Sequence, residues 1–457
     1  MPYLIGLDIG TSSVKGVLMT EQGIIAEKAR EGFTYDRRPD GTVEIGARAY
    51  LESCVKALRA LAAAAGNEKI LGICASSASG NLLFADSNGR ALSPIINWQD
   101  GRVRDEARRV LGDIDTGLLY RRTGWPFDFR TFPLAQLCRI REQSPGLLSG
   151  DNIICMSTEY LYHALTGRWG ISASAGTPFY LIDQQTGEYI PELLASLGIR
   201  KEQLPPVLPC GSVLGEVLPG AAAEYGLPAG IPVILGSFDH PSAARGAGVL
   251  KEGEMLLSCG TSWVGFFPCR SRERLVSGGL LIDPFLAPDG CWAGMVSAAS
   301  LSNNIEKYVK RYIDRSGESY RTLSSLAGGC AAGAGGLMIC PADEPDDGLT
   351  EGFSREQIAR AIMEGTVRLF KDQLARAEKA GIRAERAVMV GGPSEDPLWA
   401  RIIEDICGFP VRTDGDAHAG ARGAAVLAGI GTGVYRDETH AQECILRQQP
   451  EQETQNV

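Results

Sequence analysis

The hydrophobic and polar positions near the N-terminus predict two buried strands joined by a tight polar turn. Positions 3–7 form an apolar run, and positions 14–19 are mainly apolar apart from Lys15; short runs of this kind are typical of buried strands. Between them, Gly10 lets a ligand approach the backbone closely, and the amides and hydroxyls of Thr11 and Ser12 can point at phosphate oxygens. Because a carboxylate repels bare phosphate, we expect Asp8 to hold a hydrated Mg²⁺ that bridges to the phosphates. The alternative is an ordinary polar hairpin.

A second segment with the same design lies past the middle of the chain. Residues 254–267 again place an apolar run on each side of a small turn, here Gly260, Thr261 and Ser262. A repeated supersecondary unit indicates a duplicated domain. We therefore expect two phosphate-binding hairpins that face each other across a cleft.

The remaining pattern alternates helical and strand-like segments. Further strands are predicted at 24–29 and 69–75, and strands that close the first sheet at 81–86 and 94–98. Amphipathic periodicity predicts helices at 48–65 and within 103–150. The later segments predicted are strands at 231–235, 337–340 and 387–390 and helices at 295–312, 396–408 and 419–429.

Composition limits the class of protein. A chain of 457 residues is too long for one core and suggests two domains. A net charge of −10 argues against nucleic acid or an anionic membrane as the main partner, although it leaves an anionic nucleotide open. The 12 cysteines are scattered and only four histidines are present, which argues against a zinc site. With no signal peptide or membrane-spanning run visible, a cytoplasmic enzyme is expected.

The paired hairpins resemble those of the actin-like ATPase superfamily. Within it the chain is similar to the FGGY carbohydrate kinases, most closely to xylulokinase-like members, from residue 3 to about residue 430. The resemblance implies an α/β fold of two ribonuclease-H-like domains with a nucleotide and sugar cleft between them. The first domain would span 1–245 and the second 246–435, followed by a polar tail at 436–457.

The resemblance also implies a catalytic base. The predicted strand 231–235 leads to Asp239, which stands where the family places the carboxylate that takes a proton from the sugar hydroxyl. Such general-base help contributes about 10²- to 10⁴-fold, and positioning and charge neutralisation supply the rest. Asp239 is expected to share the metal with Asp8. The alternative for Asp239 is an N-cap of the following helix. His240 either contacts the substrate, as an amide does in relatives, or simply packs.

Sugar-binding residues follow from the same resemblance. Small residues end the strand at 69–75, and of these Ser77, Ala78 and Ser79 are expected at the sugar, with a simple loop as the alternative. Trp98 offers an apolar wall for a carbon chain, and Asp100 offers hydrogen bonds, with Arg102 as a candidate orienter. Without the family, an Asp–Arg pair at this spacing is more often structural. Gln136 and Arg139 replace a Lys and a Trp of the family signature, which weakens any transfer of substrate identity.

The adenosine of ATP is expected at the end of the predicted strand 387–390. Gly391 and Gly392 allow the adenine ring or α-phosphate to lie against the backbone, and Ser394 follows them. The expected function is therefore ATP- and Mg²⁺-dependent phosphorylation of a small ketose or polyol, with a pentulose such as xylulose favoured. A deoxy-ketose, a hexulose, glycerol and erythritol stay open, because Ala78 and Ser79 stand where xylulokinases carry Met-His.

Two other classes stay open at this point. One is a nucleotide-gated binding protein like actin, which lacks a base at the position of Asp239, and the other is a sugar-sensing regulator. Neither nucleic acid nor membrane is an expected partner. The residues leave the oligomeric state open, with a homodimer as one candidate.

Overall fold

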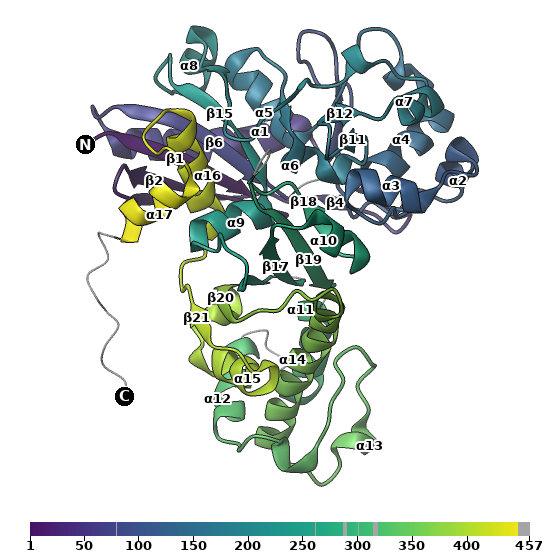
Figure 1. The fold of residues 1–457 in the computed structure, drawn as a ribbon, viewed down its shortest axis with the longest axis vertical. Coiled ribbons are helices and arrows are strands. Elements are labelled where there is room, and N and C mark those ends of the chain that lie inside the picture. The colour runs from purple at the N-terminus through teal and green to yellow at the C-terminus, as the bar shows by residue number, and fades with distance from the viewer. Residues whose placement is uncertain (79, 261, 287–289, 300, 314–318, 447–457) are drawn as a thin grey trace. The chain divides into compact units, whose positions relative to one another are not determined.

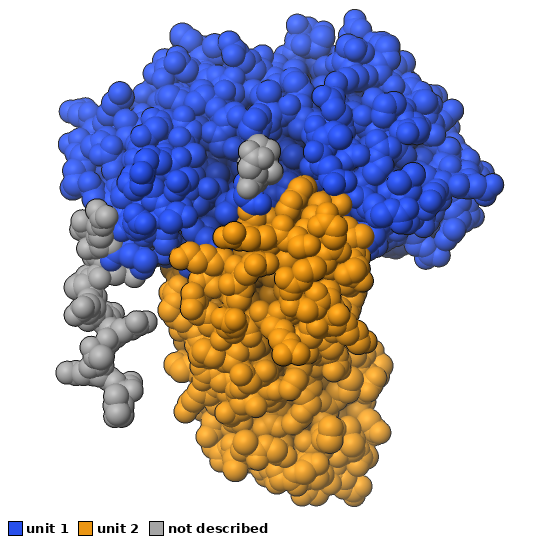
Figure 2. All heavy atoms as spheres, in the orientation of Figure 1, with its two compact units in different colours: residues 1–250, 283–290, 418–457 blue, residues 251–282, 291–417 orange. Residues whose placement is uncertain are grey.

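The computed structural model describes residues 1–457 except 79, 261, 287–289, 300, 314–318 and 447–457. Ser79 and Thr261, both expected in the site, lie outside the described residues, as does the second half of the predicted polar tail, 447–457. The contacts divide the chain into two compact units, 1–250 with 283–290 and 418–457, and 251–282 with 291–417 (Figure 2). Residues 283–290 and 418–435, which the sequence analysis places in the second domain, group here with the first unit.

The main sheet of the first unit is mixed and has the order β14-β15-β6-β1-β2-β3 (Figure 1). β1 (Tyr3–Ile9) and β2 (Ser13–Thr20) form the predicted hairpin, and β3 (Ile25–Gly32) extends it antiparallel. On the other side of β1, β6 (Ile70–Ser77) and β15 (Pro232–Phe238) run parallel to it, and β14 (Val213–Glu216) forms the edge. The carboxyl ends of β1, β6 and β15 therefore lie at one edge of the sheet, where α/β proteins place their sites.

Helices cover both faces of this sheet. The predicted amphipathic helix is α1 (Ala47–Ala65), which buries Tyr50, Leu58 and Leu61 against one face. The other face is covered from the far end of the chain by α16 (Ala419–Gly431), which packs on Leu4, Cys74 and Ile234.

Glycines allow α16 to approach its neighbours backbone to backbone. A Cβ at Gly6 of β1 would lie 1.9 Å from the carbonyl oxygen of Ala421, and a Cβ at Gly423 would lie 1.7 Å from that of Ser242. Ser242 belongs to α9 (Asp239–Ala247), the helix that follows β15. The glycines thus fix α16 tightly against both β1 and α9.

A smaller five-stranded sheet of the first unit corrects one prediction. The predicted strands at 81–86 and 94–98 form β7 (Leu82–Ala85) and β8 (Ile95–Ile96), but these pair in the order β4-β5-β8-β7-β9 and do not close the main sheet. Its other members are β4 (Asp36–Arg37), β5 (Val43–Ile45) and β9 (Ile153–Met156). The predicted helical stretch beyond it consists of α2 (Glu106–Leu111), α3 (Thr116–Thr123) and α4 (Phe132–Gln143).

The remaining helices and strands of the first unit connect these sheets. After β9 come the helices α5 (Ser157–Thr166), α6 (Ala173–Gly176), α7 (Pro191–Leu197) and α8 (Pro219–Tyr225). Two short ladders pair β10 (Ile171–Ser172) with β13 (Val207–Leu208) and β11 (Ile182–Asp183) with β12 (Glu188–Tyr189). The last helix described is α17 (Glu438–Leu446).

The second unit repeats the topology of the first sheet. β16 (Glu254–Cys259) and β17 (Trp263–Cys269) form the second predicted hairpin, and β19 (Trp292–Ala298) extends it antiparallel. β20 (Arg386–Gly391) and β21 (Val411–Thr413) then continue in parallel from β16, as β6 and β15 do from β1, and β18 (Leu281–Asp283) forms the edge. The predicted α/β fold with duplicated sheets is confirmed.

Two predictions for the second unit are wrong. The segment predicted as a helix at 295–312 begins in β19, whose Met295 pairs with Phe266, and becomes helical only in α11 (Leu301–Tyr308). Its small residues are compatible with both a helical and a strand pattern, and the pairing with β17 makes the segment a strand. Residues 337–340, predicted as a strand, form no strand in the structure.

Helices of the second unit contact this sheet at β19 and β21. The longest is α14 (Arg355–Lys379), which contacts β19, and α15 (Pro397–Cys407) follows β20 and contacts β21. The shorter ones are α10 (Arg272–Ser277), which also contacts β19, α12 (Ser319–Gly328) and α13 (Asp347–Thr350). Across the described residues, no helix combines the length and the apolar composition needed to cross a bilayer.

Candidate active site

Asp8 and Asp239 lie at the same edge of the first sheet. Asp8 is the penultimate residue of β1, and Asp239 directly follows the last residue of β15. The strand between them, β6, ends at Ser77, which pairs with both Ile9 and Phe238. The sheet topology thus brings together two carboxylates that are separated by more than two hundred residues in the sequence.

The charge of Asp239 acts on Asp8. Burial raises the pKa of the Asp8 carboxyl from 3.8 to about 6, and the charge of Asp239 adds to this rise. Lys15 and His418 oppose it with positive charge, and the Ser76 hydroxyl opposes it by donating a hydrogen bond of 3.5 Å to Asp8 Oδ1. Two carboxylates that repel each other attract a divalent cation, because the cation removes the repulsion that raises the pKa.

This donor set fits Mg²⁺. Magnesium keeps several waters and is typically bound by one or two carboxylates together with substrate phosphates, so it needs no cage of protein ligands. In the described part of the chain, no group of three or more His, Cys, Asp or Glu side chains forms such a cage.

The Asp239 side chain is partly accessible to solvent. Its side chain is 35 % exposed, and its Oδ1 accepts a hydrogen bond of 2.8 Å from the backbone amide of His240. The His240 Nε2 lies 3.9 Å from the same oxygen. Among the described residues, no lysine or arginine forms an ion pair with Asp239, so its carboxylate is available to accept a proton.

The N-terminal end of α16 lies directly against Asp8. A Cβ added at Gly420 would lie 2.6 Å from both Cγ and Oδ2 of Asp8, and His418 is the N-cap of this helix. The partial positive charge at a helix N-terminus favours a nearby anion. His418, Gly420 and Lys15 were missed by the sequence analysis. Lys15 has a recoverable signal, because the hairpin register pairs it with Asp8, whereas nothing in the sequence connects 418–420 to residue 8.

The first hairpin turn presents small polar side chains to solvent. Thr11 and Ser12 are exposed, and the turn is closed by a backbone hydrogen bond of 3.0 Å from Gly10 to Ser13. The Ser12 carbonyl accepts a hydrogen bond of 3.0 Å from Phe33, which fixes the turn from outside. The amides and hydroxyls that could contact phosphate oxygens are thus held on a rigid support.

The predicted nucleotide-binding residues of the second unit lie at the ends of paired strands. Gly260 follows β16, and its amide donates a bond of 3.2 Å to the Ser262 carbonyl. Gly391 ends β20 beside it with φ 97°, and a Cβ there would lie 2.3 Å from the Cys259 carbonyl oxygen. A glycine is therefore required at position 391 because the two strands pack closely there. At Gly392, by contrast, an added Cβ would meet no atom within 4 Å. Ser394 is buried, and its hydroxyl lies 2.6 Å from the Gly391 carbonyl.

A series of aromatic rings connects Trp98 with His240. Trp98 stacks on Phe132 with centroids 5.6 Å apart. Phe132 contacts Trp125, which contacts Phe238, which in turn contacts His240, at 5.7, 5.8 and 6.1 Å. Trp125 and Phe238 are buried, while Trp98, Phe132 and His240 are partly exposed. The structure thus joins the predicted sugar wall to the residue beside Asp239.

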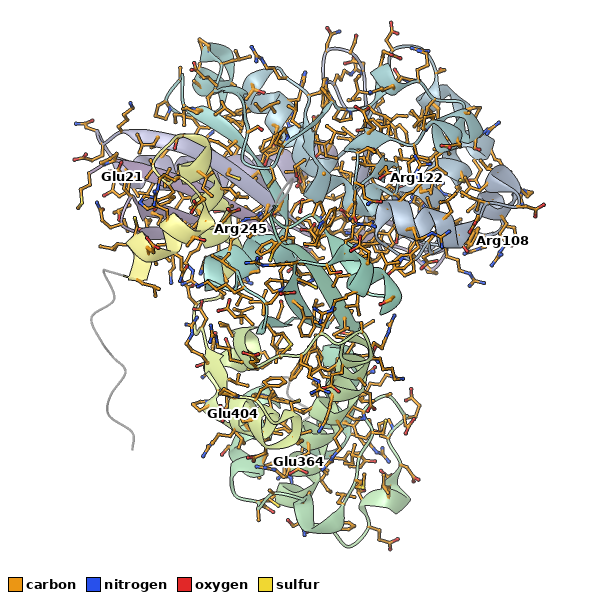
Figure 3. The ribbon with its side chains drawn as sticks, viewed as in Figure 1. Glu21, Arg108, Arg122, Arg245, Glu364 and Glu404 are labelled. Carbon is orange, nitrogen blue, oxygen red and sulfur yellow. The ribbon has the colours of Figure 1, made fainter. Side chains whose placement is uncertain are left out.

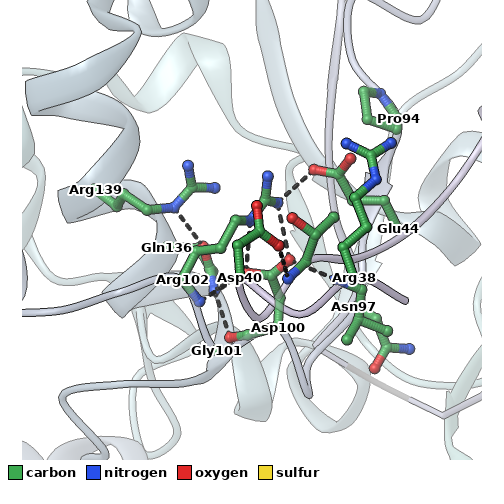
Figure 4. Close-up of polar contacts among 12 residues, drawn as sticks. Arg38, Asp40, Glu44, Pro94, Asn97, Asp100, Gly101, Arg102, Gln136 and Arg139 are labelled. Atoms are coloured by element: carbon green, nitrogen blue, oxygen red, sulfur yellow. Dashed lines mark hydrogen bonds and ion pairs between the residues drawn. The ribbon is translucent and has the colours of Figure 1, made fainter. Parts of the chain in front are cut away.

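Asp100 occupies a different environment. Its side chain is completely buried, and its oxygens accept hydrogen bonds from the Val43 amide at 2.9 Å, Arg102 Nε at 2.9 Å and Gln136 Nε2 at 3.2 Å (Figure 4). Arg102 also forms an ion pair with Glu44, and Arg139 donates to Gln136 at 2.9 Å. Every contact of the Asp100 carboxylate is internal, so the structure does not bring it to the surface near Asp239. Its predicted role at the sugar stays a prediction.

The small residues after β6 are also enclosed. Ser77 shares a short hydrogen bond with the Thr158 hydroxyl, and the Ala78 amide donates to the Ile9 carbonyl at 2.8 Å. Both side chains are buried. They line the sheet edge between Asp8 and Asp239 without presenting a free hydroxyl.

Comparison with known proteins decides the family. The model of the FGGY family of carbohydrate kinases, N-terminal domain, matches residues 3–246, and that of its C-terminal domain matches residues 329–432. The chain belongs to the FGGY family of carbohydrate kinases. This kinase shares 26 % identity with a xylulose kinase of Bacillus subtilis, over 98 % of this chain and 92 % of that one. It shares 25 % with an L-fuculokinase of Salmonella typhi, over 95 % and 93 %.

The structure of the kinase agrees with this assignment. A xylulose kinase from Rhodospirillum rubrum matches with a TM-score of 0.83 and 26 % identity, covering 94 % of this chain and 90 % of that one. The protein is therefore an ATP-dependent carbohydrate kinase, as the resemblance implied, and the alternative of an actin-like binding protein is excluded. The differing names of relatives at nearly equal identity leave the sugar itself open.

Proposed function

We propose that this kinase transfers the γ-phosphoryl group of ATP to a hydroxyl of a small ketose, with a pentulose such as xylulose as the first candidate. The observation that carries the proposal is the pair of partly exposed carboxylates at one sheet edge, of which Asp8 has a pKa raised by desolvation and by the charge of Asp239. Asp8 and Asp239 then have different tasks, because their surroundings differ.

In this proposal Asp239 is the general base. A sugar hydroxyl is a poor nucleophile, and the accessible carboxylate takes its proton as the oxygen attacks phosphorus. The partly exposed side chain and the absence of a lysine or arginine ion pair among the described residues support this task. Asp8, with Asp239, would hold Mg²⁺, which when bound neutralises charge on the phosphates.

The two turns and the loop after β20 are assigned to ATP. The amides and side chains of Gly10, Thr11 and Ser12 would bind phosphate oxygens, as would Gly260, Thr261 and Ser262. Lys15 supplies positive charge beside Asp8. Gly391, Gly392 and Ser394 are assigned to the adenosine, with the open backbone at Gly392 as the contact surface for the base.

The sugar is assigned to the aromatic series. Trp98 and Phe132 offer an apolar surface to the carbon chain, and His240 offers a ring nitrogen to a hydroxyl close to Asp239. The xylulose kinase names among the relatives favour a pentulose, while the L-fuculokinase name favours a deoxy-ketose. Ser77, Ala78, Ser79 and Asp100 are the remaining proposed contacts of the sugar.

The test is a substrate panel with two variants. Purified protein is assayed for ADP release with ATP, Mg²⁺ and xylulose, fuculose, a hexulose, glycerol or erythritol. We expect one ketose to stimulate release, and Asp239→Asn to lower kcat by about 10²-fold or more with KM for ATP nearly unchanged. Asp396→Asn is the matched control, because Asp396 caps α15 in the second unit. An unchanged rate in Asp239→Asn would remove it from the role of base.

A further inference from the structure

A buried arginine lies on the same helix as Asp239 and has no part in the chemistry described so far. Arg245, labelled in Figure 3, belongs to α9. Its side chain is only 1 % exposed. Burying a guanidinium is costly unless it is paired and hydrogen-bonded. Its partners therefore indicate what this cation does in the fold.

One nitrogen of Arg245 contacts the chain on both sides of Asp239. Nη1 donates to the Ser237 hydroxyl at 3.2 Å and to the Pro241 carbonyl at 3.4 Å. Ser237 stands two residues before Asp239 and Pro241 two residues after it. The junction of β15 and α9, from which the Asp239 side chain projects, is thus held by a single guanidinium group.

The other two nitrogens anchor Arg245 to distant parts of the first unit. Nε donates to Glu438 Oε1 of α17 at 3.1 Å, and Nη2 donates to the Phe285 carbonyl. The guanidinium carbon also lies 4.7 Å from the centre of the Phe285 ring. Every nitrogen is used in a fixed planar arrangement that a lysine, with one nitrogen, cannot reproduce.

We propose that Arg245 is a positioning residue that fixes the strand-to-helix junction carrying Asp239. The inference rests on the proposed role of Asp239 as the base. A base works only within hydrogen-bond reach of the proton that it takes, and a displacement of about 1 Å costs up to about 10²-fold in rate. Arg245 contacts neither sugar nor nucleotide in this scheme, so its effect falls on kcat.

The experiment compares Arg245→Lys with Arg360→Lys. Arg360 is similarly buried on α14 of the second unit, where it pairs with Glu364 at 2.7 Å. We expect Arg245→Lys to lower kcat about 10- to 100-fold with KM for ATP and sugar within about twofold. The Arg360→Lys control is expected to lose thermal stability while its kcat stays close to that of the unaltered protein. Equal kcat in the two variants would overturn the proposal.

A smaller variant keeps the test decisive if Arg245→Lys does not fold. Ser237→Ala removes the hydroxyl and with it one of the two hydrogen bonds of Nη1, and we expect a fall in kcat of about fivefold. An unchanged kcat in Ser237→Ala would overturn the proposal as well. Asp239→Asn is measured in the same assay, so a failure of the positioning role of Arg245 can be distinguished from a failure of the role of Asp239 as the base. If Asp239→Asn is inactive and Ser237→Ala is fully active, only the positioning role is lost.

Discussion

Replacing Gly420 by alanine is expected to impair the kinase with little effect on its stability. The added Cβ would lie 2.6 Å from Cγ and Oδ2 of Asp8, whereas ordinary contact begins at 3.4 Å. The carboxylate must therefore move by about 0.8 Å, the difference between these distances. Because a displacement of about 1 Å costs up to about 10²-fold in rate, we expect a fall of this order in kcat and a higher Mg²⁺ requirement.

The expected effect on stability is small for two reasons. The two atoms that the methyl group meets most closely, Cγ and Oδ2 of Asp8, belong to the end of a side chain that can rotate, and the Asp8 Cβ at 3.1 Å needs a shift of only a few tenths of an ångström. Alanine is also favoured over glycine in a helix by up to about 1 kcal/mol. We expect the free energy of unfolding to change by less than about 1 kcal/mol.

The control is Gly220→Ala in α8, where a Cβ meets no atom within 4 Å. This variant is expected to gain about 0.5–1 kcal/mol of stability and to keep its kcat. The assays are ADP release at varied Mg²⁺ concentration and thermal unfolding followed by circular dichroism. If Gly420→Ala keeps the kcat and Mg²⁺ dependence of the unaltered protein, the assignment of Asp8 to the metal is refuted.

Three further predictions concern other residues. Asp8→Asn should raise the Mg²⁺ concentration needed for half-maximal activity about tenfold or more, measured by metal titration; an unchanged titration contradicts the metal role. Phe132→Leu should raise KM for the sugar and leave KM for ATP unchanged, because it removes the ring stacked on Trp98; equal changes in both constants contradict a sugar wall. Burial raises the pKa of Glu159 from 4.5 to about 7. Between pH 4.5 and pH 7 the folded state therefore keeps a proton that the unfolded state has released, so the free energy of unfolding falls as the pH rises through this range. At about 1.4 kcal/mol per pKa unit this reaches about 3 kcal/mol, and Glu159→Gln should gain stability at pH 8 relative to pH 5; an equal effect at both pH values contradicts it.

The hairpins and the α/β class could be predicted because their determinants are local. The apolar runs on each side of Gly10 and of Gly260 specify strand, turn and strand within twenty residues. The strand β19 could not be predicted, because it forms a strand only through its pairing with β17, which the local sequence pattern does not contain.

The surroundings of the candidate site depend on segments that are distant in the sequence, so they could not be predicted from it. Asp8 touches Gly420, more than four hundred residues away, through the close packing of glycines in α16. Asp100 was expected at the sugar from its motif, and its burial depends on contacts from Val43 and Gln136 that the motif does not contain. The roles assigned to Asp8 and Asp239 stay predictions that the variants above test, and the role of His240 at the sugar stays a prediction.

The position of α16 in the chain has a consequence for biosynthesis. While the nascent chain is on the ribosome, Leu4, Cys74 and Ile234 are synthesised long before the helix that shields them. Until residues 419–431 emerge, one face of the first sheet is an exposed apolar surface of the kind that chaperones bind. A recombinant fragment ending at residue 250 would keep that surface permanently and should aggregate, whereas the same fragment supplied with a peptide of residues 418–446 should stay in solution.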